Sequence, residues 1–170
     1  MKNYLNYIIE TIAAHSSEFE NAGLTPPQTI DIYMGQPTNQ DDFEFALPAV
    51  FIDYSADYDG ETFDLILHVV QDFGADTENF SPEREKGLSF ITFLSVLKRC
   101  LYGVKMLPVF KPLRLYQEVP MPPDLYYYHL LTFRCNFDTD KYSDIARYVD
   151  VSPVVPVLED GRLKDTMNGV

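Results

Sequence analysis

The spacing of hydrophobic positions predicts two helices in this chain. Residues 4–14 repeat their apolar positions at helical spacing, with polar residues between them, which is typical of an amphipathic helix packed on one face. A second helix is expected to begin at Ser81, whose hydroxyl can cap the first turn, with Pro82 at the first helical position. Its apolar stripe ends before Gly103, which can adopt the left-handed conformation that closes a helix. The two stripes consist of Leu5, Ile8, Ile9, Ile12, Phe90, Leu94, Leu97 and Leu101.

Five segments have the composition and alternation of β-strands. They cover residues 29–33, 49–54, 62–72, 113–119 and 125–137. Both alternating sets of residues in the third segment are largely apolar, so this strand is expected to be largely covered on both faces. Asp59-Gly60 separates the second strand from the third and favours a tight type I′ hairpin turn with positive φ angles.

The order of these elements is one helix, three strands, one helix and two strands. It predicts an α+β fold, in which a single mixed, mainly antiparallel sheet of about five strands has two helices packed on one face. Residues 1–140 are expected to form this single domain. Residues 141–170 differ in composition and are marked by prolines, so they are expected to form a C-terminal extension that is partly extended or flexible.

Acidic residues dominate the charge of the chain and are unevenly distributed. The formal net charge is −13, which disfavours binding of phosphates through a broad basic patch. Residues 1–80 hold 15 acidic residues and one basic residue, whereas residues 81–170 hold 11 acidic and 12 basic residues. One interpretation is a solvated acidic face. The other is a polarised protomer whose acidic and basic-leaning surfaces meet in neighbouring copies, because such head-to-tail contacts form rings when the rotation closes.

No arrangement of residues in the sequence is typical of an active site. His15, His68 and His129 lie far apart and outside metal-binding spacings, and the latter two are expected to be core or sheet-surface histidines. Cys100 and Cys135 lie in apolar contexts and are expected to be buried thiols rather than a disulfide. We therefore expect no catalytic residues, no cofactor and no metal ion, and the chain is not expected to be an enzyme.

The acidic residues near the hairpin turn have part of the spacing of a calcium-binding loop. If Gly60 takes the glycine position of an EF-hand loop, Asp57 and Asp59 fall at ligand positions. The same alignment places Ile66 where the bidentate glutamate is required. The plain hairpin is therefore favoured over a calcium site.

Neither a secretory signal nor a membrane span is expected from the sequence. The N-terminal residues lack a basic region followed by a long apolar run. No uninterrupted apolar stretch approaches the roughly 20 residues that cross a bilayer. We expect a protein that is made in a cytoplasm and has no membrane partner.

Six segments carry a recognisable succession of motifs. They are IDIYMGQP (30–37), LPAVFIDY (47–54), FDLILHVVQD (63–72), FITFLSVLKRCLYGV (90–104), LRLYQEV (113–119) and LYYYHLLTFRCNF (125–137). Their order and character resemble those of the tail terminator, or tail completion, proteins of long-tailed phages. In that family an N-terminal helix precedes a strand that ends in a Gly-x-Pro loop, and a Pro-Ala-Val-Phe-Ile strand, a long strand, a polar loop, a helix and a final hairpin follow. The resemblance covers about residues 1–140.

This resemblance implies a structural protein of a phage or prophage. Members form a ring, usually a hexamer, on the last ring of the tail tube, where they end tail polymerisation and present the surface that joins the head. The implied partners are further copies of the chain, the tail tube protein and a head-completion or connector protein. The implied location is the neck of the virion, after assembly in the host cytoplasm. DNA passes through the lumen without specific binding, and an acidic lumen would repel its phosphates.

Two alternative functions stay open at this point. Another head–tail joining protein of the neck would share the ring but attach to the head. A monomeric acidic binding module, such as a DNA mimic that inhibits a nucleic-acid enzyme, would bind a basic partner instead. The molecular mass at high protein concentration distinguishes a ring from a strict monomer.

The candidate interface residues lie in loops and in the C-terminal extension, since loops displayed by a rigid sheet commonly carry contacts. Phe43 and Phe45 are candidate anchors, with packing on their own sheet as the alternative. Val154 and Val155 could add a strand to a neighbour's sheet, with a disordered tail as the alternative. The full set is Asp41, Asp42, Phe43, Phe45, Asp57, Tyr58, Asp59, Asp76, Glu78, Val154 and Val155.

Overall fold

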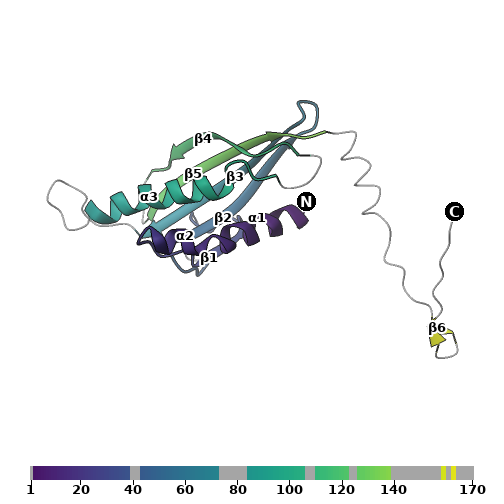
Figure 1. Ribbon diagram of the computed structural model, residues 1–170, viewed down its shortest axis with the longest axis horizontal. Coiled ribbons are helices and arrows are strands. Elements are labelled where there is room, and N and C mark those ends of the chain that lie inside the picture. Colours follow the sequence, from purple (N-terminus) through teal and green to yellow (C-terminus); the bar gives the residue numbers. More distant parts are fainter. Residues whose placement is uncertain are drawn as a thin grey trace.

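A five-stranded sheet with helices against one face forms the centre of the molecule (Figure 1). The computed structural model describes residues 2–38, 43–72, 84–105, 110–122, 126–138, 158–159 and 162–163. The helices are α1 (Lys2–Ala14), α2 (Ser16–Asn21) and α3 (Arg84–Leu101). The strands of the sheet are β1 (Thr29–Ile32), β2 (Ala49–Asp57), β3 (Thr62–Asp72), β4 (Arg114–Pro120) and β5 (Tyr126–Asn136). Two further short strands, β6 (Leu158–Glu159) and β7 (Arg162–Leu163), pair with each other.

The strand order in the sheet is β1-β2-β3-β5-β4. β1 and β2 run parallel, and the other three neighbouring pairs are antiparallel. The longest pairing joins β3 to β5 along the full length of both strands. The predicted α+β fold, with one mixed and mainly antiparallel sheet and helices on one face, is therefore confirmed.

The helix-covered face of the sheet is the main hydrophobic core. Strand side chains alternate between faces, so one alternating set on each strand points toward the helices. Leu67 of β3, Ile12 of α1 and Leu97 of α3 are fully buried in one cluster. Full burial of such a side chain stabilises the fold by ~1.5–3 kcal/mol. Packing of these stripes, more than helix propensity, therefore holds α1 and α3 on the sheet.

Aromatic rings close this core near the β2–β3 hairpin. Phe63 of β3 packs edge-on against Phe110 with ring centroids 5.3 Å apart, and Tyr4 of α1 packs edge-on against Phe110 at 4.8 Å. Tyr54 of β2 stacks on Phe63 at 6.0 Å. These contacts join the N-terminal helix to the central strand and to the segment that precedes β4.

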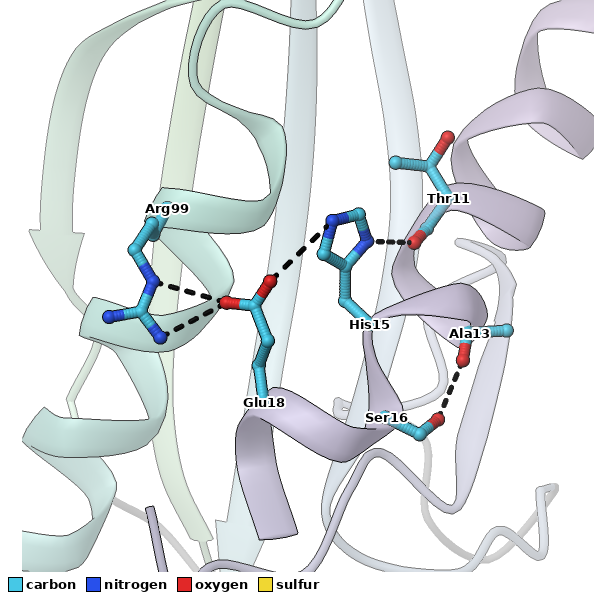
Figure 2. A network of polar contacts seen from close by, with 6 residues as sticks. All are labelled: Thr11, Ala13, His15, Ser16, Glu18 and Arg99. Carbon is cyan, nitrogen blue, oxygen red and sulfur yellow. Dashed lines mark hydrogen bonds and ion pairs between the residues drawn. The ribbon is translucent and has the colours of Figure 1, made fainter. Parts of the chain in front are cut away.

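A polar network holds α2 between the other two helices (Figure 2). Nε and Nη2 of Arg99 on α3 lie 3.1 and 3.0 Å from one carboxylate oxygen of Glu18 on α2. The other oxygen lies 3.7 Å from Nε2 of His15, whose Nδ1 is 2.7 Å from the carbonyl oxygen of Thr11 on α1. Since such partly exposed ion pairs contribute only ~0–1 kcal/mol, the network mainly fixes the orientation of α2.

The predicted ends of both helices are confirmed, whereas the first helix begins at Lys2, two residues before the predicted range. Gly103 follows α3 with φ +81°, as expected for a left-handed cap. The short helix α2 was not predicted, and the chain turns away after it at Gly23, with φ +74°. Ser81 and Pro82, the predicted start of the second helix, lie outside the described residues.

The hairpin between β2 and β3 is confirmed, but the predicted type I′ turn is wrong. The strands stay paired up to Asp57, so the loop covers residues 58–61. The positive φ angle belongs to Glu61, at 49°, and not to Gly60. The Asp57 carboxylate accepts hydrogen bonds from two turn amides at 3.1 and 3.0 Å. An aspartate that bonds to the backbone two and three residues on favours this wider loop over a two-residue turn.

Candidate functional site

The sheet face opposite the helices, which we call the open face, is acidic over the strands β1, β2 and β3. Alternate residues of each strand point to this face, and the acidic ones come from β1, β2 and β3. The acidic half of the sequence therefore supplies three neighbouring strands of the sheet. By register and alternation, the carboxylates on the open face belong to Asp31, Asp53, Asp57, Asp64 and Asp72.

Among the described residues, a covering segment lies over one end of the open face. Phe45, from the segment before β2, packs edge-on against Phe51 with centroids 5.1 Å apart, and Val70 beside them is fully buried. Toward the hairpin, Ile66 and Asp64 of β3 are partly exposed. The expectation that this strand is largely covered on both faces agrees with its burial, which is complete near Val70 and partial near the hairpin, where the described covering segment does not extend.

Arg134 of β5 neutralises part of the acidic surface. Its Nε and Nη2 atoms donate to the two carboxylate oxygens of Asp64 at 2.6 and 2.7 Å. The guanidinium carbon also lies 3.7 Å from the centroid of the Tyr116 ring. The hydrogen bonds to Asp64 raise the pKa of Arg134 above its usual value. Bidentate geometry fixes both charges, so this pair marks the boundary between the acidic strands and β4.

Three cations surround the start of β4, and we call this surface the basic corner. Lys105, Lys111 and Arg114 are exposed. In the described part of the chain, no carboxylate lies within ion-pair distance of them. Arg114 instead donates to the Tyr102 hydroxyl, and its guanidinium carbon lies 4.9 Å from the centroid of that ring. The basic corner therefore presents positive charge to solvent on the side of the sheet away from β1.

His68 lies buried at the covered end of the open face, with 7% of its surface exposed. Its ring stacks on Tyr33, with centroids 3.6 Å apart and planes 6° apart, and its Nδ1 atom lies 2.5 Å from the Tyr128 hydroxyl. No hydrogen-bonding partner for its buried Nε2 atom occurs among the described residues. Burial lowers the pKa of His68 to about 4, although the charge of Asp53 acts to raise it. The imidazole is therefore neutral at neutral pH, as expected for a core histidine.

The hairpin brings three of the predicted interface residues together. Asp57 is exposed and caps the turn with its carboxylate. Tyr58 is 50% exposed, and its ring packs edge-on against Phe137 at 5.7 Å. Asp59 is exposed beside them. The hairpin therefore combines negative charge with an accessible aromatic ring, which suits a contact with another protein.

The other predicted interface residues are not brought to the hairpin. Phe45 packs on its own sheet, which agrees with the alternative to an anchor, and Phe43 is partly exposed. The remaining predicted residues, Asp41, Asp42, Asp76, Glu78, Val154 and Val155, lie outside the described residues.

Sequence reasoning missed the charged residues that organise the open face. Asp64 and Arg134 become partners only because β3 and β5 are neighbours. Strand alternation would have placed Asp53 and Asp64 on one face. The basic corner had no comparable signal in the sequence. Lys105 and Arg114 are brought near each other by backbone hydrogen bonds that join Gly103 and Val104 to Leu113.

A surface pocket of about 270 Å³ lies between the helices and the covered end of the sheet. Its described lining is polar and apolar in nearly equal measure, and Asp72 is the single ionisable residue in it. The described lining residues are Gly23, Leu24, Thr25, Leu47, Pro48, Gln71, Asp72, Ser89 and Phe93.

The described residues show neither a metal-binding group nor a membrane-spanning helix. Within the described ranges, no three His, Cys, Asp or Glu side chains are grouped closely enough to hold a metal ion. The helices that the structure describes are too short or too polar to cross a membrane. Comparisons with protein-family models, curated proteins and solved structures gave no match to this chain.

Proposed function

We propose that this chain is a structural subunit that assembles into a homo-oligomeric ring on the end of a phage tail tube. The ring would stop tube growth and present the surface that joins the head. The resemblance of the sequence to tail terminator proteins motivates this proposal, and it rests on the order helix, three strands, helix and two strands. The five strands of the sheet and the helices α1 and α3 follow this order along the chain, with the short helix α2 added after α1.

The observation that carries the proposal is the charge separation across one sheet. The aspartates of the open face lie on β1, β2 and β3, whereas the basic corner adjoins β4 at the opposite edge. An acidic edge and a basic edge on the same subunit favour head-to-tail association, in which the acidic edge of one copy contacts the basic edge of the next. Such contacts close into a ring when the rotation between copies divides a full turn.

The acidic open face also fits a passage for DNA. Carboxylates such as Asp53 and Asp57 on a surface that lines a bore would repel phosphates, so that DNA slides without binding. The ring would then need no sequence-specific contact with DNA. If a structure of the assembled ring showed these carboxylates on its outer surface, the role in lining the bore would be wrong.

Tail tube assembly provides the direct test. Purified chain is added to polymerising tail tube protein from the same phage or prophage, and tube lengths are measured by electron microscopy. We expect shorter tubes that carry an added ring at one end, with the chain sedimenting with the tubes. Tubes of unchanged length, with the chain left in the supernatant, would refute the proposal.

The uncovered row of carboxylates favours a second candidate, a monomeric acidic module that binds a basic protein in place of DNA. This candidate predicts a strict monomer at high concentration, and DNA should compete for its partner. A neck protein that joins the head instead would form a ring but bind the head connector in preference to tail tubes. The same binding experiment, done with heads and with tubes, separates these two neck functions.

A further inference from the structure

In the described sheet, the outer edge of β1, part of the β2 edge and the outer edge of β4 have no strand beside them, and the β2 and β4 edges can meet in neighbouring copies. β1 pairs with β2 only from Ala49 to Ile52, so the rest of β2, Asp53–Asp57, has a strand on one side only. β4 pairs with β5 on one side. On its other side, the described structure shows backbone bonds only at Leu113, just before the strand. Unpaired edges of this kind are templates for a strand of another chain.

The directions of these two edges are compatible with pairing between copies. β2, β3, β5 and β4 are antiparallel in succession, so β2 and β4 run in opposite directions within one copy. A rotation about a ring axis along the strands preserves strand direction in every copy. β4 of one copy and β2 of the next would therefore meet as an antiparallel pair, which is the commoner kind.

The register across the sheet aligns the two edges at the same height. Tyr54 pairs with Leu65, which pairs with Phe133, which in turn pairs with Leu115. The row beside it runs from Ser55 through Asp64 and Arg134 to Arg114. Without a shift along the ring axis, Tyr54 of one copy lies opposite Leu115 of its neighbour.

The backbone groups at these two positions point outward. The carbonyl of Ile52 accepts a hydrogen bond from Tyr33, on the β1 side, and strand alternation turns the Tyr54 groups to that same side. Leu113 bonds outward to Gly103 and Val104, so Leu115 also points outward. Two residues with outward groups that face each other can exchange both of their backbone hydrogen bonds.

We propose that copies of this chain join by antiparallel pairing of β2, centred on Tyr54, with β4 of the next copy, centred on Leu115. This contact deepens the proposed ring and rests on that function. Tyr54 is 39% exposed and Leu115 is 37% exposed, so the pair would bury two apolar side chains. Arg114 would lie opposite Ser55 and diagonal to Asp53 and Asp57, which are within reach of a long cross-strand side chain.

Asp53 makes this edge selective. Its carboxylate accepts a hydrogen bond of 2.7 Å from the Tyr54 N–H, which is the donor that a new strand would need. Asp31 on β1 does the same for Ile32, also at 2.7 Å. Charged side chains on free edges oppose indiscriminate pairing. An incoming strand that brings a cation, as β4 does with Arg114, would draw the Asp53 carboxylate away and release the donor.

Cysteine cross-linking tests the geometry of the contact. In a hydrogen-bonded antiparallel pair the Cα atoms are about 5.5 Å apart, which a disulfide can span. A chain that carries both Tyr54→Cys and Leu115→Cys should form covalent ladders under mild oxidation. Either single variant, and a control with Tyr54→Cys and Ser95→Cys, should not. The native thiols Cys100 and Cys135 are buried, so they should not contribute.

Charge reversal tests the complementarity of the two edges. Asp53→Lys alone and Arg114→Glu alone should each weaken self-association about threefold to tenfold, since each variant turns an attractive diagonal pair into a repulsive one. The double variant should restore it. Glu10→Lys, an exposed position on α1, makes the same change in net charge as Asp53→Lys and should leave self-association unchanged. Circular dichroism confirms that each variant is folded.

The outcomes separate this contact from the ring itself. If wild-type chain associates on its own or on tail tubes but neither cross-linking nor charge rescue occurs, the β2–β4 contact is wrong and the ring stands. If wild-type chain is monomeric at millimolar concentration and also with tail tubes, both proposals are wrong. Ladders together with rescue support the contact, even where tube capping is absent.

Discussion

Acidification should destabilise this protein through one buried side chain, His68. The imidazole is enclosed by Tyr33, which stacks on it, and by Tyr128, whose hydroxyl lies 2.5 Å from Nδ1. Burial also raises the pKa of Tyr128, so this hydroxyl stays neutral over the range considered. Asp53 is the described acidic residue that most favours the imidazolium form, and it does not offset burial. Protonation therefore places a charge where its hydration is lost.

The size of the effect follows from the two pKa values of His68. The folded value is about 4 and the ordinary value is 6.5, so the unfolded chain binds the proton more readily. The contribution to stability is complete above pH 6.5 and is lost as the pH falls through 4. Linkage gives a loss of about 2 kcal/mol by pH 5 and about 3 kcal/mol by pH 4.

Urea unfolding at a series of pH values measures this loss. Carboxylates titrate over the same range in every variant, so the informative quantity is the difference between wild type and His68→Gln. Between pH 7 and pH 4, wild type should lose about 3 kcal/mol more unfolding free energy than the variant. Parallel pH profiles for the two proteins would refute the argument, because they would show that His68 takes up its proton equally well when folded.

Three further predictions test other parts of the structure. Leu97→Ala should lower the unfolding free energy by about 2–5 kcal/mol, whereas Leu88→Ala, 45% exposed on the same helix, should change it by about 1 kcal/mol or less; equal effects in urea unfolding would contradict the placement of α3. Asp57→Ala should destabilise by about 1 kcal/mol through its lost turn bonds, and Asp57→Asn, which keeps an accepting oxygen, should recover most of this; a melting temperature lowered equally by both would count against the turn. Cys100 and Cys135 should react with a thiol reagent at pH 8 only after unfolding, because burial raises their pKa values to about 11 and about 12; immediate reaction of folded protein would show that they are accessible.

Local patterns in the sequence predicted most of the individual elements. The run of alternating and largely apolar residues over 62–72 predicted the bounds of β3 correctly. Gly103 was predicted to close α3 and does so with a positive φ angle. In contrast, the side chain of Asp57 decided the hairpin turn, and the Asp-Gly pair alone did not reveal this.

Long-range pairing could not be predicted from the sequence. β5 lies between β3 and β4, and nothing in the alternation of either strand specifies that neighbour. The pairing of Asp64 with Arg134 follows from this order, so the site on the open face was missed together with it. The hairpin residues were found because loops are recognisable locally. The basic corner was not, since its members are scattered along the chain and meet only in the fold.

The central position of β3 has a consequence for synthesis of the chain. β3 is paired with β5 over its whole length, from Thr62 with Asn136 to Asp72 with Tyr126. One edge of β3 therefore has no neighbouring strand until β5 leaves the ribosome. A nascent chain that ends before residue 126 would expose β3, an apolar strand of 11 residues, as an open edge, which is a known route to aggregation. The middle of the sheet is therefore completed last. Chains interrupted between β4 and β5 should be those that most need a chaperone.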